Sequence, residues 1–356
     1  MKYIKIRHLP NKLIFVTIVF LVLLKTFIYF LAKQNIVNTD LGGSNDSNYY
    51  HAYAIGLDNY AVNIWPIILR YLEDMSLYSR DSISLCLYII SIFLIPILVC
   101  NLAGLKFKKN QKLYLYLLLL CQMYPTLYFY TWDIYRDVFM VFIFLLGCLI
   151  VRKTINSSSL ISFIFYFLIS INIGFFLTYL RPYLGYGFIL SLFLWKIKLT
   201  KQRLYTFGIF YIVALYTAYS IGALDRLIEY RTGFEEMGGG STMGLDFTNP
   251  VLFLPNLVLS TLGQLFGLYI TNSLAIIILT VETLPFLLML VYIIKNVKLA
   301  DDFLRFLIIF FILYASVWLI GNDNLGTAVR LRMYNYIAVY ICFFYILRLK
   351  KNLQPS

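Results

Sequence analysis

The chain has 356 residues, of which 61% are hydrophobic and only 13% are charged. A soluble domain of this length cannot bury so much apolar surface, so the composition excludes one and predicts an all-α, polytopic integral membrane protein. The formal net charge of +13 would suit a nucleic-acid-binding protein. The lysines, however, lie beside apolar runs, as positive-inside sorting requires, so we expect no nucleic-acid partner.

Apolar runs of about 20 residues predict the membrane spans of the first half. A basic tail precedes the first span, 13–32, which carries Lys25. The outward loop 33–81 follows. Within it, 49–71 reads as a helix lying at the membrane interface and interrupted near Pro66. Further spans are predicted at 82–102, 113–132, 138–151, 160–179 and 183–195.

The second half contains one apolar run that we expect not to cross. A span at 204–224 leads to the outward loop 225–250. Two apolar runs follow, 251–271 and 272–294, and the lysines after the second mark the cytoplasm. Because the chain passes from the outer side to the cytoplasm between 250 and these lysines, only one of the two runs can cross the membrane. Pro255 and Asn256 interrupt the first run, which we therefore interpret as re-entrant or interfacial. Spans at 303–320 and 333–347 enclose the outward loop 321–332. We expect about ten spans in one transmembrane domain, 1–356, with both termini in the cytoplasm.

Arginine is concentrated on the predicted outward side, whereas the cytoplasmic turns carry mostly lysine. This distribution runs against positive-inside sorting, so a cause is needed. The arginines could neutralise outward carboxylates as structural ion pairs, or they could hold an anionic substrate, because guanidinium binds phosphate in a bidentate manner. Lipid headgroups are a third possible ligand. The outward arginines are Arg70, Arg80, Arg136, Arg181, Arg226, Arg231, Arg330 and Arg332.

The outward loop 225–250 combines Arg226 and Arg231 with the glycine run 238–240 and Ser241. Guanidinium groups beside bare backbone N–H groups can cradle a phosphate. The alternative is a solvated loop whose glycines only permit turns.

Two acidic constellations are candidates for catalysis. Asp133, Arg136 and Asp137 have i, i+3, i+4 spacing and would share one helix face, either as a local ion pair that caps the helix or as a sugar or pyrophosphate site. Asp46 precedes an aromatic stretch, either as a helix N-cap or as a general base for a sugar hydroxyl. His51 ranks below Asp46 as a catalyst.

Other motifs add little chemistry. Arg330 and Arg332 are two residues apart, so on a helix they point to different sides and do not share one ligand. The five cysteines lie in or beside apolar runs without metal-ligand spacing, and we interpret them as small apolar side chains. No Walker loop, HExxH or GxSxG appears, so we expect no metal and no cofactor.

The stretches R-x2-F-x3-GGGS (231–241) and G-T-A-V-R-L-R-x-Y (326–334) resemble segments of bacterial surface-polysaccharide polymerases. The many short spans, the low charge and the arginine-bearing outward loops are also similar to those Wzy-type O-antigen or capsule polymerases, and to polyprenyl-linked glycosyltransferases with the GT-C fold.

This resemblance implies polymerisation of undecaprenyl-pyrophosphate-linked repeat units at the outer face of the inner membrane. Arginines would stabilise the pyrophosphate leaving group, and a carboxylate would take the proton of the attacking hydroxyl. Membrane lipid and a chain-length regulator protein are the further partners that it implies. The expected bases are Asp46 and Asp133, and the expected binding residues are Arg136, Arg181, Arg231, Arg330 and Arg332.

Other classes compete with this interpretation. A GT-C transferase could add single sugars from a polyprenyl-phosphate donor. A transporter of lipid-linked glycan would need charges in the middle of the membrane, and such mid-span charges are few, namely Lys25 and Glu282. A sugar acyltransferase would need a clear His–Asp pair, which the sequence lacks.

Overall fold

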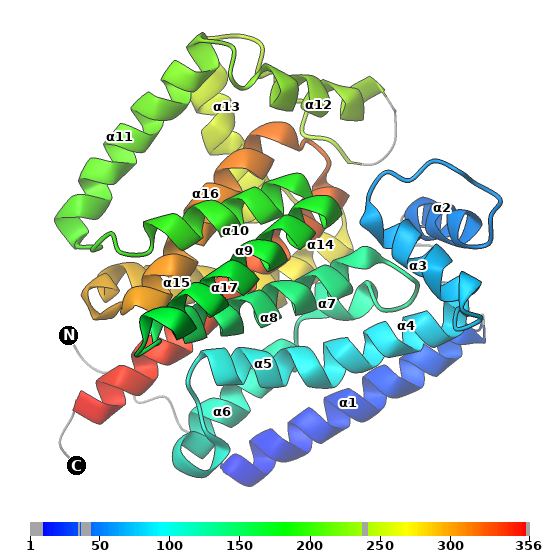
Figure 1. The fold of residues 1–356 in the computed structure, drawn as a ribbon. Helices are drawn as coiled ribbons and strands as arrows, with labels where there is room; N and C mark the ends of the chain where they lie inside the picture. The colour runs from blue at the N-terminus through cyan, green and yellow to red at the C-terminus, as the bar shows by residue number, and fades with distance from the viewer. Residues whose placement is uncertain (1–9, 35, 37–43, 237–240, 354–356) are drawn as a thin grey trace.

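The computed structural model describes residues 10–34, 36, 44–236 and 241–353 (Figure 1). In this part of the chain the regular structure is helical, apart from one isolated bridge between Thr242 and Asn324. Six helical stretches are long and apolar enough to cross a membrane, or seven if one bent pair counts as a span. These stretches agree with the predicted all-α, polytopic membrane protein, although they do not amount to the ten expected spans. The six are 11–33, 80–102, 136–155, 160–180, 273–295 and 302–321.

The first segment predicted to lie outward forms two short helices rather than one. After α1 (Asn11–Lys33) come α2 (Ser44–Ala54) and α3 (Ile64–Asp74). The predicted break at Pro66 is wrong: the chain leaves α2 through Gly56, whose φ is +82°. Pro66 instead lies in the first turn of α3, where a missing N–H is tolerated. The side chain of Asn63 caps this helix by accepting from the N–H of Trp65 at 2.9 Å.

Prolines reshape the next two predicted spans. One consists of α4 (Arg80–Ile89), the π-helical segment η1 (Ile90–Leu94) and α5 (Ile95–Leu102), which has Pro96 in its first turn. The predicted span 113–132 is not continuous. It divides into α6 (Phe107–Gln122) and α7 (Pro125–Phe129), because proline cannot continue the hydrogen-bond ladder of the preceding helix.

Helices α8 (Arg136–Ile155), α9 (Leu160–Leu180) and α10 (Pro182–Leu194) pack as neighbours, and α10 also packs on α16 (Asp302–Gly321). Glycine permits the close approach of α9 and α10. A Cβ atom on Gly185 would lie 2.3 Å from the backbone nitrogen of Thr178 and 2.5 Å from the carbonyl oxygen of Gly174. This contact fixes the tight turn at Arg181.

The segment 225–250, predicted to be an outward loop, begins as a helix. The chain turns by 81° between α11 (Lys201–Ser220) and α12 (Asp225–Glu236), with Gly222 at a φ of +75°. Helix α13 (Phe253–Ser260) and the π-helical segment η2 (Thr261–Leu265) follow. Together they fall short of the roughly 20 residues that a span needs, in keeping with the expected non-crossing run.

The last part of the chain supplies the centre of the bundle. Helix α14 (Ser273–Ile278), the π-helical segment η3 (Leu279–Thr283) and α15 (Leu284–Lys295) form one apolar stretch, and a short η4 (Val297–Leu299) precedes α16. The predicted loop 321–332 is largely absent, because α17 (Leu325–Leu353) begins at Leu325. The Asn324 side chain accepts from the N–H of Thr327 at 2.9 Å and so caps its start. Arg330 and Arg332 therefore lie on a helix.

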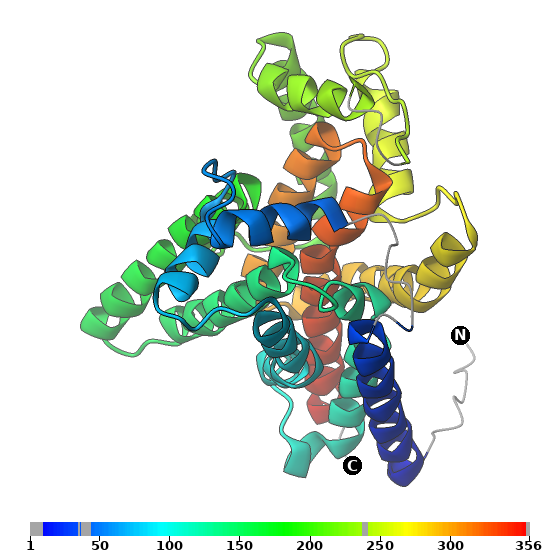
Figure 2. The same ribbon diagram turned by 90° about the vertical axis from the view of Figure 1, so that its right-hand side faces the viewer.

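The bundle has two chemically different ends. Figures 1 and 2 place the start of α1 and the finish of α17 at one end, and α2 and α12 at the other. At the first end, Arg152 donates to the carbonyl of Asn101 at 2.9 Å, and Arg348 donates to that of Gly104 at 2.6 Å. At the opposite end, Arg330 pairs with Asp46. Arginines therefore lie at both ends, where these two contact backbone carbonyls at one end and Arg330 contacts a carboxylate at the other.

Candidate functional site

Five charged residues from four parts of the chain meet at the end of the bundle that carries α2. We call them the outer arginine cluster: Asp46, Arg136, Asp137, Arg181 and Arg330. Arg330 pairs with Asp46, and its Nη1 lies 4.0 Å from Asp137 Oδ2. Arg181 Nη2 donates to Asp137 Oδ1 at 3.2 Å, and Arg136 donates to the carbonyl of Leu180 at 2.8 Å. Asp137 thus links two arginines that are 149 positions apart.

The cluster is buried and has hydrogen-bonding capacity to spare. The Arg181 and Asp137 side chains are only 4% and 1% exposed. Among the described residues, Nε and Nη1 of Arg181 and Nε of Arg330 are buried donors without a hydrogen-bond partner. Three guanidinium groups also face two carboxylates, so one positive charge is in excess. Because unpaired buried donors are costly, this arrangement favours an oxygen-rich anionic ligand.

Tyrosine rings line the cluster. The guanidinium of Arg330 lies 5.5 Å from the centre of the Tyr130 ring, and that of Arg181 lies 6.0 Å from Tyr183. Burial raises the pKa of Tyr130, so its hydroxyl stays neutral despite the nearby Arg330. The Tyr334 hydroxyl is another buried group that has no partner within the described part of the chain. These hydroxyls add neutral hydrogen-bonding groups beside the guanidinium groups.

The two predicted general bases have different surroundings. The Asp46 side chain is 44% exposed and touches the cluster through Arg330. It lies within the first turn of α2 rather than at the N-cap. Asp133 is held by Arg80, whose Nε and Nη2 donate to its two oxygens at 2.8 and 2.5 Å. Burial raises the pKa of Asp133, but hydrogen bonds from Arg80 and Ile134 outweigh it and leave the pKa below its usual value. Of the two predicted bases, Asp46 is the one that belongs to the cluster.

The expected helical triad of Asp133, Arg136 and Asp137 does not form. Helix α8 begins only at Arg136, after Tyr135 in an extended conformation, so Asp133 lies outside it. Each acid instead finds a distant partner: Asp133 pairs with Arg80, and Asp137 pairs with Arg181. The local ion pair predicted from the spacing is therefore wrong.

Arg231 lies apart from the cluster and has a complete set of partners. Its side chain is 2% exposed and pairs with Asp323. Its remaining donors reach the carbonyls of Leu245, Leu319, Ile320 and Asn322, the last at 2.6 Å. The second oxygen of Asp323 accepts from the N–H groups of Met243 and Gly244. These bonds fasten α12 and the segment after it to α16 and α17.

Arg332 faces another part of the core, as its spacing from Arg330 predicts. Its Nη2 lies 3.5 Å from Glu282 Oε2, and both side chains are almost fully buried. Glu282 also accepts from the N–H and hydroxyl of Thr126. The substrate-binding residues predicted from the sequence thus divide into three places, with Arg136, Arg181 and Arg330 together and Arg231 and Arg332 elsewhere.

His51, which ranked below Asp46 as a candidate catalyst, contacts a nearby tyrosine. Its Nδ1 lies 2.9 Å from the Tyr78 hydroxyl, and the two rings stack at 5.9 Å. Neither contact connects it to the cluster. It is a hydrogen-bonded residue of the first outward segment.

Local sequence spacing does not reveal several partners of the predicted site residues. Arg80 was noted only as an outward arginine, and Asp323 and Tyr130 were not singled out. Their partners lie 53, 92 and 200 positions away in the sequence, so no local spacing could reveal them. What the sequence does indicate is that arginines and carboxylates are both concentrated in the segments predicted to lie outward.

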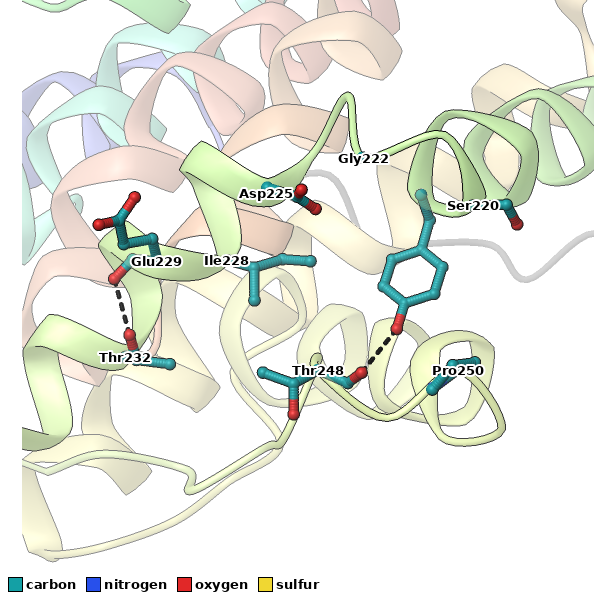
Figure 3. Close-up of a pocket in the computed structure, with 9 residues that line it drawn as sticks. Ser220, Gly222, Asp225, Ile228, Glu229, Thr232, Thr248 and Pro250 are labelled. Atoms are coloured by element: carbon teal, nitrogen blue, oxygen red, sulfur yellow. Dashed lines mark hydrogen bonds between the residues drawn. The ribbon is translucent and has the colours of Figure 1, made fainter.

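A cavity of about 780 Å³ lies where α11 turns into α12 (Figure 3). None of the predicted arginines lines it. The glycine run predicted to cradle phosphate, 238–240, lies outside the described residues. Within those residues no group of three or more His, Cys, Asp or Glu side chains is arranged to hold a metal ion.

Comparisons of the chain with known protein families, with curated proteins and with solved structures find no match. The case for a function therefore rests on the site itself.

Proposed function

We propose that this protein transfers glycan chains between lipid carriers, joining undecaprenyl-pyrophosphate-linked repeat units into a polysaccharide. The reaction takes place at the outer arginine cluster. This end of the bundle faces away from the cytoplasm in a bacterial inner membrane, and both termini are cytoplasmic. That orientation follows from the lysine-rich turns gathered at the opposite end.

The observation that carries the proposal is the set of unpaired donors in the cluster. Arg181 and Arg330 share Asp137 and retain three N–H-bearing nitrogens without partners among the described residues. A pyrophosphate offers several charged oxygens that can accept such bonds. The apolar helices around the cluster suit a ligand whose remaining part is a polyprenyl chain.

Each group then has a chemical task. A hydroxyl of the acceptor sugar forms a bond to the anomeric carbon of the donor glycan while the bond from that carbon to the pyrophosphate oxygen breaks. Asp46 takes the hydroxyl proton, because it is the exposed carboxylate of the cluster. Arg181 and Arg330 stabilise the negative charge that grows on the leaving group. Arg136 holds the α9–α10 turn through Leu180. Arg231 and Arg332 support the surrounding helices.

Glycan length in cells tests the proposal. A strain that lacks the gene should carry single repeat units, and the wild-type gene should restore long chains. Arg330→Ala and Asp46→Asn should lower chain extension by roughly 10²–10³-fold, the cost of removing one such group. Arg181→Lys preserves the buried positive charge but removes the guanidinium group that can donate two parallel hydrogen bonds. This variant should also shorten the glycan chains.

The control is Arg226→Ala, an exposed arginine of α12 outside the cluster. It should restore full-length chains. Membrane levels of each variant should match the wild type. Long chains from Arg330→Ala would overturn the proposal, as would a deletion strain whose chains are of full length but lack a side branch. The latter would indicate addition of single sugars.

A further inference from the structure

The cavity at the bend between α11 and α12 has a lining unlike that of the arginine cluster. Its volume of about 780 Å³ falls in the range of small-molecule sites. Two carboxylates line it, with no lysine or arginine among the lining residues. Tyr219, Ser220, Gly222, Asp225, Ile228, Glu229, Thr232, Thr248 and Pro250 form its wall (Figure 3).

The chemistry of this wall disfavours phosphate and favours sugar hydroxyls. Asp225 and Glu229 are exposed acceptors, one turn apart on α12, and no ion pair neutralises them among the described interactions. Carboxylates accept hydrogen bonds from hydroxyl or ammonium groups but repel phosphate. The hydroxyls of Ser220, Thr232 and Thr248 can both donate and accept. A polyhydroxylated ligand without negative charge matches this set.

Both sides of the cavity are held in place. The Tyr219 hydroxyl donates to the carbonyl of Thr248 at 2.7 Å, and its ring stacks on Phe253 at 4.4 Å. Ile228 of the wall belongs with Phe253 and Ile320 to one buried cluster. The Arg231–Asp323 pair then ties α12 to the start of α17, the helix that carries Arg330. The cavity and the arginine cluster are therefore mounted on one connected framework.

We propose that this cavity is a glycan-binding subsite, which holds neutral or amine-bearing sugars of the substrate while the arginine cluster holds its pyrophosphate. This inference rests on the proposed function, since it divides one substrate between two places. Asp225 and Glu229 are the recognition residues, and acidic sugars are excluded by their charge.

The test uses purified full-length protein in lipid nanodiscs and two separate probes. One is the repeat-unit oligosaccharide released from the host's own surface glycan, which carries no phosphate. The other is inorganic pyrophosphate. The double variant Asp225→Asn, Glu229→Gln should weaken oligosaccharide binding about tenfold and leave pyrophosphate binding unchanged. Arg330→Gln should show the reverse pattern. Glu73→Gln, an exposed acid on α3, is the matched control and should change neither.

Thermal unfolding of the double variant and of Glu73→Gln should match the wild type, since these acids are exposed. Oligosaccharide binding that is absent from the wild type, or unaffected in the double variant, overturns the subsite. If the acids control oligosaccharide binding but Arg330→Gln leaves pyrophosphate binding and glycan length unchanged, the subsite stands and the proposed function fails. The two ideas can therefore fail independently.

Discussion

Arginine serves different purposes at neighbouring positions of this molecule. Arg231 has partners for its donors and lies in a fully buried pair, which is a structural arrangement. Arg181 and Arg330 are also paired, yet retain donors without partners within the described residues. Sequence alone identified outward arginines and left ion pairing and substrate binding open. The sequence could not distinguish arginines in structural ion pairs from arginines that could bind substrate, because the ion-pair partners are distant in the chain. Asp46 and Arg330, for example, lie 284 positions apart.

Arg231→Ala should destabilise the protein strongly. Removal of one partner leaves Asp323 as a buried, uncompensated charge, which costs about 3–5 kcal/mol. The free energy of unfolding in detergent should fall by this amount. Arg226→Ala on the same helix is exposed and should change stability by less than about 0.5 kcal/mol. Equal stability of the two variants would show that the buried pair has no structural role.

Helix boundaries in this chain depend on single residues that interrupt otherwise apolar runs. The positions of most spans follow from hydropathy, and 13–32, 160–179 and 303–320 were predicted to within a few residues. The failures include Pro66, which lies inside α3, Pro125, where a predicted span divides, and the predicted loops 225–250 and 321–332, where α12 and α17 begin. Hydropathy does not predict where α17 begins, because its first residue is set by the Asn324 cap and by burial against other helices.

The contact of α9 with α10 depends on Gly185. Its substitution by alanine would force a Cβ atom against the backbone of Thr178, so we expect a loss of about 1–3 kcal/mol in the free energy of unfolding. Arg181 lies at the turn between these helices, so chain extension should also fall. Gly208→Ala in α11 is the control, because a Cβ there meets nothing within 4 Å. Unfolding measured in detergent should separate the two, and an unchanged Gly185→Ala protein would contradict the close packing.

The molecule as a whole is a bundle whose lysines gather mostly at one end, while ion pairs between distant segments, such as Arg330–Asp46 and Arg80–Asp133, lie at the other. Positive-inside sorting orients such a bundle with the lysines in the cytoplasm. In the proposed orientation the arginines lie outside, where acids from distant segments neutralise several of them, as the pairs Arg330–Asp46 and Arg80–Asp133 illustrate.

Cysteine labelling tests this orientation. In a Cys86→Ser background, which removes the exposed native cysteine, Glu73→Cys should react with a membrane-impermeant thiol reagent added to intact spheroplasts. Lys109→Cys, at the lysine-bearing end, should react only after permeabilisation. Both positions are exposed. The opposite pattern would reverse the topology and remove the active face from the outer side.

The most direct measurement is the affinity of purified protein in nanodiscs for undecaprenyl pyrophosphate. The wild type should bind it, and Arg330→Gln should weaken binding about 10–100-fold, since a hydrogen bond to a charged group contributes about 1.5–3 kcal/mol. Arg226→Ala should bind like the wild type. Equal affinity of the Arg330→Gln and wild-type proteins would contradict the assignment of this cluster to the pyrophosphate carrier.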